Sequence, residues 1–229
     1  MSDMYAMPMD QFVIELPVDT RLAFIRKVYS LFLVSLLATI AVTVSVLSVP
    51  IAADIAGRYW YVWVGLYFLL SWFGEAIAAQ GKTVGYIVLS VLSVVTGLAF
   101  GPTIRFYIGN QGVDIVYQAL GLTTAIFGGL TAGVFITKQD FSFLRGFLWM
   151  GVLALIGVGV LGIFINFDFG MQQAITIGGV LLFVGFILYD TSNILHHYRE
   201  EQVAAAAAAI YLDFVILFMK LLRLLRGRD

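Results

Sequence analysis

Seven long apolar stretches divide the chain and are separated by short polar connections. The stretches run over residues 28–49, 60–79, 84–103, 113–137, 144–164, 173–195 and 203–225. Each has the roughly 20 residues that a helix needs to cross a hydrocarbon core about 30 Å thick. Helices are predicted because open-edged strands would leave backbone polar groups unsatisfied in lipid. The pattern therefore predicts an all-α integral membrane protein with seven transmembrane helices.

The segment before the first stretch has a different, mixed polar composition. It alternates acidic residues with apolar ones and ends in three basic residues, Arg21, Arg26 and Lys27. The apolar run that follows is too long for the core of a cleaved signal peptide, so we interpret it as an uncleaved first span. We accordingly divide the chain into an N-terminal tail, residues 1–27, and one membrane domain, residues 28–229.

The composition supports this class and excludes others. Hydrophobic residues make up 61% of the chain, charged residues 12%, and the mean hydropathy is +0.98. An average soluble domain is about 45–50% apolar and about 25% charged. The net charge of −1 gives no reason to expect a nucleic-acid partner, and the absence of cysteine excludes disulfides and thiolate metal sites. The lipid bilayer is the expected partner, and we expect no bound cofactor.

Basic residues are distributed unequally between the two sides of the predicted bundle. The opposite side holds Arg58 and Arg105, whereas the N-terminal side holds seven basic residues: Arg21, Arg26, Lys27, Lys82, Lys138, Arg145 and Arg199. The positive-inside rule then places the N-terminus in the cytoplasm, and we expect a bacterial inner membrane. The C-terminal tail would be external although it carries Lys220, Arg223, Arg226 and Arg228, so a re-entrant last helix remains the alternative.

Two aspartates stand inside the last two apolar stretches. A carboxylate within a membrane helix costs roughly 2.5 to 3.5 kcal/mol on insertion scales, so Asp190 and Asp213 need a partner, a proton or water. Asp190 lies near the cytoplasmic end of its span, and Asp213 lies about 15 Å deep from the same side, at 1.5 Å per residue. Glu75 is expected at the depth of Asp190, with Arg145 on the same side. These residues form the candidate functional site.

Other polar residues near this site allow simpler explanations. Asp190, Asn193 and His197 recur at i, i+3 and i+7, which predicts a polar stripe facing the bundle interior. Asp190 could instead be a helix-end acid that reaches interfacial water, and Glu75 could extend to the interface. His197 is predicted to be interfacial rather than a metal ligand, and Asp140 is predicted to cap the fifth span.

Small residues predict where helices approach one another closely. Gly129 and Gly133 have the G-x-x-x-G spacing that permits close packing of membrane helices. The alanine run of residues 204–209 opens the last span with almost no side-chain bulk. Such a helix can sit at the centre of a bundle with neighbours on all sides.

The chemistry of the two aspartates suggests a switch. Two carboxyl groups close together in a low-dielectric site cannot both ionise cheaply, so they share a proton and titrate as a coupled unit. When the shared proton is lost, the doubly charged site repels itself or attracts a hard cation such as Ca²⁺. Conduction also needs weak binding, which two carboxylates without a full ligand cage would provide.

Three segments together resemble a known family. They are "TKQDFSFLRGFLWMG" at the fifth span, "LYDTSNILHHY" closing the sixth, and "AAIYLDFVILFMKLLRLL" forming the seventh. The chain resembles the transmembrane Bax inhibitor motif family in a bacterial-type version. The resemblance implies six helices around a central seventh and a pH-sensitive calcium leak, with Asp190 and Asp213 as a di-aspartyl pH sensor and transient calcium ligands.

The resemblance also suggests a latch near this pair. Some members pair an acid on the second helix with an arginine that follows it. Here Glu75 is displaced toward the end of the helix and no arginine follows, so Glu75, Arg145 and His197 are the candidate gate or latch residues.

Three alternatives remain to be weighed. The protein could regulate a membrane protease or another membrane complex without transporting ions itself. An intramembrane aspartyl protease is less well supported, because Asp213 lacks a Gly-x-Gly-Asp context and no proline follows Pro102. Retinal binding through Lys220 is weakened because the third span carries no acid as a counter-ion. We therefore expect a protein that is not an enzyme.

Overall fold

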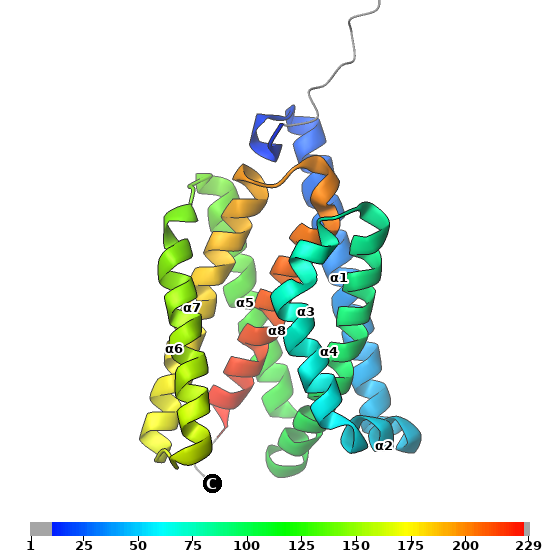
Figure 1. The fold of residues 1–229 in the computed structure, drawn as a ribbon, viewed down its shortest axis with the longest axis vertical. Helices are drawn as coiled ribbons and strands as arrows, with labels where there is room; N and C mark the ends of the chain where they lie inside the picture. The colour runs from blue at the N-terminus through cyan, green and yellow to red at the C-terminus, as the bar shows by residue number, and fades with distance from the viewer. Residues whose placement is uncertain (1–10, 227–229) are drawn as a thin grey trace, which may run out of the picture.

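The computed structural model describes residues 11–226, which form a bundle of antiparallel helices (Figure 1). Seven helices of this part of the chain are long and apolar enough to cross a membrane, which confirms the all-α class and the number of spans. The helices are α1 (Val18–Ser48), α2 (Pro50–Arg58), α3 (Trp60–Ala78), α4 (Lys82–Gln111), α5 (Asp114–Thr137), α6 (Arg145–Phe164), α7 (Phe169–His196) and α8 (Val203–Leu225). Three short 3-10 turns, η1 (Val13–Glu15), η2 (Ser142–Leu144) and η3 (Glu200–Gln202), precede α1, α6 and α8.

The ends of three elements differ from the sequence prediction. α1 begins at Val18, so part of the predicted tail is helical. The connection after the first span contains the short helix α2, which starts with Pro50 at a position where a missing N–H costs nothing. The third apolar stretch was predicted to end at residue 103 and to be followed by a polar connection, but α4 continues through Pro102 to Gln111 and is capped by Gly112, whose φ is +81°. That prediction was wrong because neighbouring helices in a membrane bundle tolerate proline.

α8 is the central helix of the bundle. Its alanine run, residues 204–209, is at most 4% exposed, and α8 contacts α1, α3, α4, α5 and α7. Alanine side chains make this possible, because each adds only one methyl group between neighbouring backbones. The prediction of a central seventh span is confirmed. α6 lies further out, in front of α7 in Figure 1, and packs mainly on α7.

Close packing by glycine occurs at a different place from the one predicted. A Cβ atom added to Gly97 or Gly101 of α4 would lie 2.6 Å from Val42 or 2.7 Å from Val46 of α1, so α1 and α4 need both glycines. A Cβ atom at Gly129 or Gly133 would meet nothing within 4 Å. The prediction for α5 was wrong, since the G-x-x-x-G spacing does not say which side of a helix has a neighbour.

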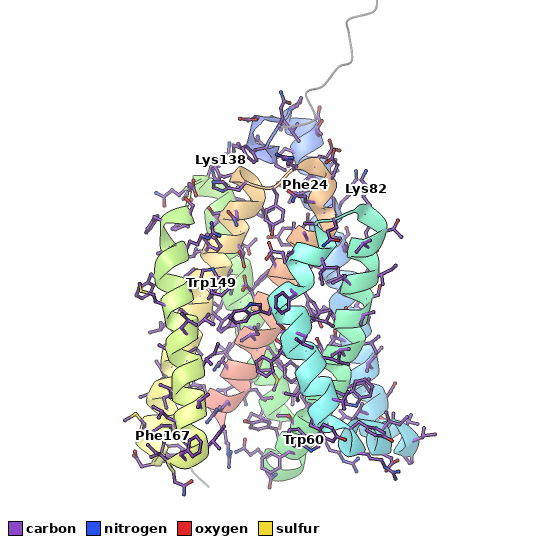
Figure 2. The ribbon with its side chains drawn as sticks, viewed as in Figure 1. Phe24, Trp60, Lys82, Lys138, Trp149 and Phe167 are labelled. Carbon is purple, nitrogen blue, oxygen red and sulfur yellow. The ribbon has the colours of Figure 1, made fainter. Side chains whose placement is uncertain are left out.

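The two ends of the bundle carry different residues. Lys82 and Lys138 lie at the end that also holds η1, whereas Trp60 and Phe167 lie at the opposite end with the last turn of α8 (Figures 1 and 2). Because seven candidate spans alternate in direction, the start of α1 and the end of α8 lie at opposite ends of the bundle. Lys82 and Lys138 therefore lie at the same end of the bundle as the start of α1, as the count of basic residues on the N-terminal side assumed.

The packing of α1 on α4 predicts a difference between two similar glycine substitutions. Gly97→Val should destabilise the protein by roughly 1–3 kcal/mol, because the new side chain collides with Val42 and overpacks the contact. Gly129→Val is the matched control, since it lies in mid-helix and faces open space. Unfolding of the purified variants by increasing SDS in mixed micelles measures both. Equal losses would contradict the assigned α1–α4 contact.

Candidate functional site

The acidic pair sits between the central helix and its neighbour α7. α7 and α8 are antiparallel and joined by a short connection that contains η3, so residues near the end of α7 face the first half of α8. The carboxyl groups of Asp190 and Asp213 are neighbours there, and each lies within reach of the other's charge. Two carboxyl groups can bond directly only when one of them carries a proton. The structure thus brings together the two acids that the sequence singled out, with the Asp213 side chain 4% exposed.

Glu75 lies beside this pair and is held by a residue that sequence reasoning missed. The Tyr198 hydroxyl donates a hydrogen bond to the Glu75 carboxylate, which interacts electrostatically with Asp190. Burial and the nearby charges of Glu75 and Asp190 raise the pKa of Tyr198 well above its ordinary value. The phenol therefore remains a donor at neutral pH. This bond joins α3 to the connection between α7 and α8.

A cavity of about 400 Å³ lies where α7 joins α8. Its wall is formed by one side of α3, by the end of α7 and by the start of α8, and its polar lining comprises Glu75, Asn193, His197, Tyr198 and Gln202. We call this cavity the vestibule. Asn193 follows Asp190 by one turn of α7, so the vestibule reaches the layer next to the acidic pair. Two residues of the predicted polar stripe, Asn193 and His197, therefore line a cavity.

His197 contacts Asp140 rather than the acidic pair. The His197 Nε2 atom lies 4.0 Å from Asp140 Oδ2, while Asp140 Oδ1 accepts from the Ser142 N–H at 2.8 Å and from the Ser192 hydroxyl at 3.4 Å. Slight burial raises the pKa of Asp140, but the hydrogen bonds from Ser142 and the positive field of His197 and His196 lower it by more. The prediction that Asp140 caps this span was wrong, because the cap residue of α6 is Leu144. Asp140 instead satisfies the backbone of the turn before α6 and ties that region to α7.

Arg145 is not brought to the acidic pair. Its side chain is exposed at the start of α6, and its electrostatic effect falls on Tyr189. Arg58 pairs with Asp54, and His197 lies beside Asp140, so neither of these contacts involves Arg145. The geometry therefore leaves Glu75, through Tyr198, as the latch candidate that lies nearest to Asp190.

The N-terminal segment docks on the same connection. The Val13 N–H donates to the Tyr198 carbonyl at 3.0 Å, and the Val13 side chain is fully buried. Phe12 packs edge-on against His197, with ring centroids 6.2 Å apart. The available signal was the apolar cluster "FVIEL" within an otherwise polar tail. η1 therefore closes over the α7–α8 connection, an arrangement that sequence reasoning did not predict.

A second buried network lies two residues before Asp213. The Tyr211 and Thr39 hydroxyl oxygens are 2.6 Å apart. The Thr39 hydroxyl also donates to the Ser93 carbonyl oxygen, at 3.1 Å. This network ties α8 to α1 and α4. It fixes the rotation of α8, and with it the direction in which Asp213 points.

Comparison with known proteins identifies the family. The family model for the inhibitor of apoptosis-promoting Bax1 matches residues 21–229. The chain belongs to the Bax inhibitor family. It is 31% identical to Bax inhibitor 1 of Schizosaccharomyces pombe, over 94% of this chain and 82% of that protein. It is also 32% identical to Protein LIFEGUARD 4 of Arabidopsis thaliana, over 92% and 87% of the two chains.

A bacterial relative is similar to the same extent. An uncharacterized membrane protein of Vibrio cholerae is 31% identical over 88% of this chain and 87% of its own. The resemblance noted in the sequence is thereby confirmed over nearly the whole membrane domain. The names of the family and of these relatives suggest a membrane protein without enzymatic activity.

The bond between Tyr198 and Glu75 predicts a measurable coupling. In a double-mutant cycle, Tyr198→Phe and Glu75→Gln should show an interaction free energy of about 1 kcal/mol. Either substitution alone removes the hydrogen bond, so the double variant should be destabilised by less than the sum of the two single variants. Unfolding in SDS mixed micelles measures the cycle. Tyr86→Phe paired with Glu75→Gln is the control, since Tyr86 is exposed on α4. A coupling near zero for Tyr198 would show that the bond contributes nothing to stability.

Proposed function

We propose that this Bax inhibitor family protein is a pH-sensitive calcium leak channel in which Asp190 and Asp213 form the proton sensor. The observation that supports it most is that the two carboxyl groups are neighbours between α7 and the buried α8. Structural acids in a membrane bundle are expected to pair with cations or backbone groups. Two neighbouring acids can instead share a proton, and the loss of that proton makes the site more negative.

The proposed switch follows from like charges in a low-dielectric layer. While the pair shares a proton, α7 and α8 are held together at Asp190 and Asp213. Loss of the proton leaves two carboxylates that repel each other and attract a hard cation. Because Asp213 belongs to the central helix, any displacement there is transmitted to the helices that surround it.

The vestibule supplies an entry for cations in this mechanism. Glu75 offers a carboxylate at its wall, within electrostatic reach of Asp190, and Asn193 and Gln202 add neutral oxygen atoms. Tyr198 holds Glu75 and at the same time accepts the backbone bond from Val13. We infer that this contact is the latch of the channel, in place of the arginine that other members use.

We also propose the orientation and the location predicted from the basic residues, namely the bacterial inner membrane with the vestibule facing the cytoplasm. The end of the bundle with η1 carries Lys82 and Lys138, in accord with the positive-inside rule. In this orientation the leak connects the cytoplasm, through the vestibule and the acidic pair, with the external side.

Neutralising one member of the pair tests the sensor. Asp213→Asn or Asp190→Asn should remove most of the pH dependence of calcium flux into proteoliposomes, or shift its midpoint, because an amide keeps the size of the side chain and abolishes the coupled titration. Asp168→Asn is the control, since Asp168 caps α7 and an asparagine caps about as well. Asp140→Asn is a poorer control because Asp140 also contacts His197.

Two outcomes would reject this function. Unchanged flux amplitude and pH midpoint in both pair variants would make the pair structural. Absence of calcium flux in the parent protein, reconstituted alone, would favour the alternative function as a regulator of a membrane protease or another membrane complex.

The orientation makes a prediction of its own. A reporter fused before Arg21 should score as cytoplasmic and a reporter fused after Asp229 as external, because the chain crosses the membrane seven times. Alkaline phosphatase and green fluorescent protein fusions at each end measure this. Two cytoplasmic results would mean that α8 does not cross completely.

A further inference from the structure

Lys220 is a cationic residue of α8 that the mechanism above does not use. It lies five residues before the end of α8 at Leu225, and its side chain is half-buried in the bundle. Among the described residues, no acidic side chain forms an ion pair with Lys220 and no group accepts a hydrogen bond from it. A charged side chain within a membrane bundle is costly, and such residues pair with one another or mark a path for ions.

Lys220 projects from the same side of α8 as Asp213. The seven residues between them make almost two full turns at about 3.6 residues per turn, so the two side chains leave the helix in nearly the same direction. Their Cα atoms are about 10 Å apart along the helix axis, at about 1.5 Å per residue. Asp213 neighbours Asp190 of α7, and Lys220 lies against Gly179 of that same helix. We call this line of contact, from Asp190 and Asp213 to Gly179 and Lys220, the α7–α8 seam.

The Lys220 side chain occupies the space that Gly179 leaves by having no side chain. A Cβ atom added to Gly179 would lie 3.1 Å from both Cε and Nζ of Lys220. A Cβ atom added to the adjacent Gly178 would meet nothing within 4 Å, so the contact belongs to the face of α7 that meets α8. Gly179 is about 15 Å along α7 from its first residue, Phe169. The ammonium group is therefore held inside the bundle, and it does not extend to the membrane surface as an interfacial lysine would.

The lysine and the vestibule lie on opposite sides of the acidic pair. The vestibule is lined by Asn193 of α7, which follows Asp190, and by Ala205 of α8, which precedes Asp213. Gly179 and Lys220 lie in the other direction along both helices. Fully buried apolar residues, Ile187 and Leu217, stand between the level of the acids and the level of the lysine. A cation that moved from the vestibule past the acids along the seam would therefore meet Lys220 next.

We propose that Lys220 is a positive barrier on the ion path that limits how much calcium passes beyond the acidic pair. The proposal rests on the proposed function and adds a residue that sets the size and the selectivity of the leak. A unit positive charge repels a divalent cation twice as strongly as a monovalent one at the same distance. Inside the bundle salt screens this repulsion much less than it does at the surface. Lys220 therefore impedes Ca²⁺ more than it impedes K⁺.

The absence of cysteine from the chain allows the charge at this position to be removed and then restored. Lys220→Cys is reconstituted into liposomes, and its calcium flux is compared with that of the parent at one fixed pH. Flux should rise by roughly tenfold, which corresponds to a barrier lowered by about 1.4 kcal/mol. A methanethiosulfonate reagent that carries a trimethylammonium-ethyl group then attaches a cation to the thiol. Flux should fall back toward the parent's value, whereas the reagent with a sulfonate group should leave it high.

The restored charge separates a barrier from a loss of structure. A variant that leaked because it had misfolded would not close again when a positive group is attached. K⁺ flux in the same vesicles gives a second measure, since it should rise less than calcium flux in Lys220→Cys. Mass spectrometry of the protein recovered from the liposomes shows how much of the thiol has reacted.

Arg223→Cys is the matched control. Arg223 is also basic and lies on α8, nearer to its end, but its side chain is exposed. A charge in water is largely screened, so this substitution and its modification by either reagent should leave calcium flux within about twofold of the parent's value.

Four results would overturn the barrier while leaving the channel function intact. Calcium flux of Lys220→Cys could equal or fall below that of a parent that leaks calcium. The positive reagent could fail to attach, which would place the residue away from any water-filled path. It could also attach without lowering the flux. Calcium and K⁺ fluxes could rise equally, as they would in a loosened bundle. Absence of calcium flux from the parent and from Lys220→Cys alike would instead reject the channel function itself.

Discussion

The structure depends on how closely other helix backbones can approach α8. Five helices contact this one, and its N-terminal half accommodates them because it presents only methyl groups over residues 204–209. A Cβ atom on Gly85 of α4 would lie 2.5 Å from the Cβ of Ala204, so even one added carbon is excluded there. In lipid, where apolar burial between helices gains little, such van der Waals contact is a principal source of association.

Central burial also governs every polar group that α8 carries. Tyr211 and Asp213 are both buried inside the bundle, so each must find its partner on a neighbouring helix. Tyr211 finds Thr39, and Asp213 finds Asp190. The first contact fixes the rotation of α8. The second, two residues along the same helix, is the one to which the proposed function assigns the proton.

The sequence was sufficient for features that depend on composition and on spacing within one helix. The seven spans follow from their length and hydropathy, and the central position of α8 follows from its alanines. The meeting of Asp190 and Asp213 follows from depth along two antiparallel neighbours. The continuation of α4 through Pro102 was not predictable in this way, because it depends on support from neighbouring helices.

Contacts between remote segments were missed for the same reason. The side of α5 that bears Gly129 and Gly133 has the right spacing but no neighbour, whereas Gly97 and Gly101 on α4 meet α1. Likewise, nothing near Glu75 in the chain indicates that Tyr198 will bind it. A spacing pattern defines one face of one helix, and only the three-dimensional arrangement decides what covers that face.

The central position of α8 also bears on assembly. α8 is the last of the seven spans in chain order, so it is synthesised after the other six. Those helices therefore enter the membrane before α8, which contacts five of them in the folded bundle. Until then Thr39 lacks Tyr211, Asp190 lacks Asp213, and Gly85 of α4 faces no alanine. The bundle must therefore remain open to a late insertion at its axis, and the step that completes the core also assembles the acidic pair. A chain that stops before α8 lacks both its core and one half of the acidic pair.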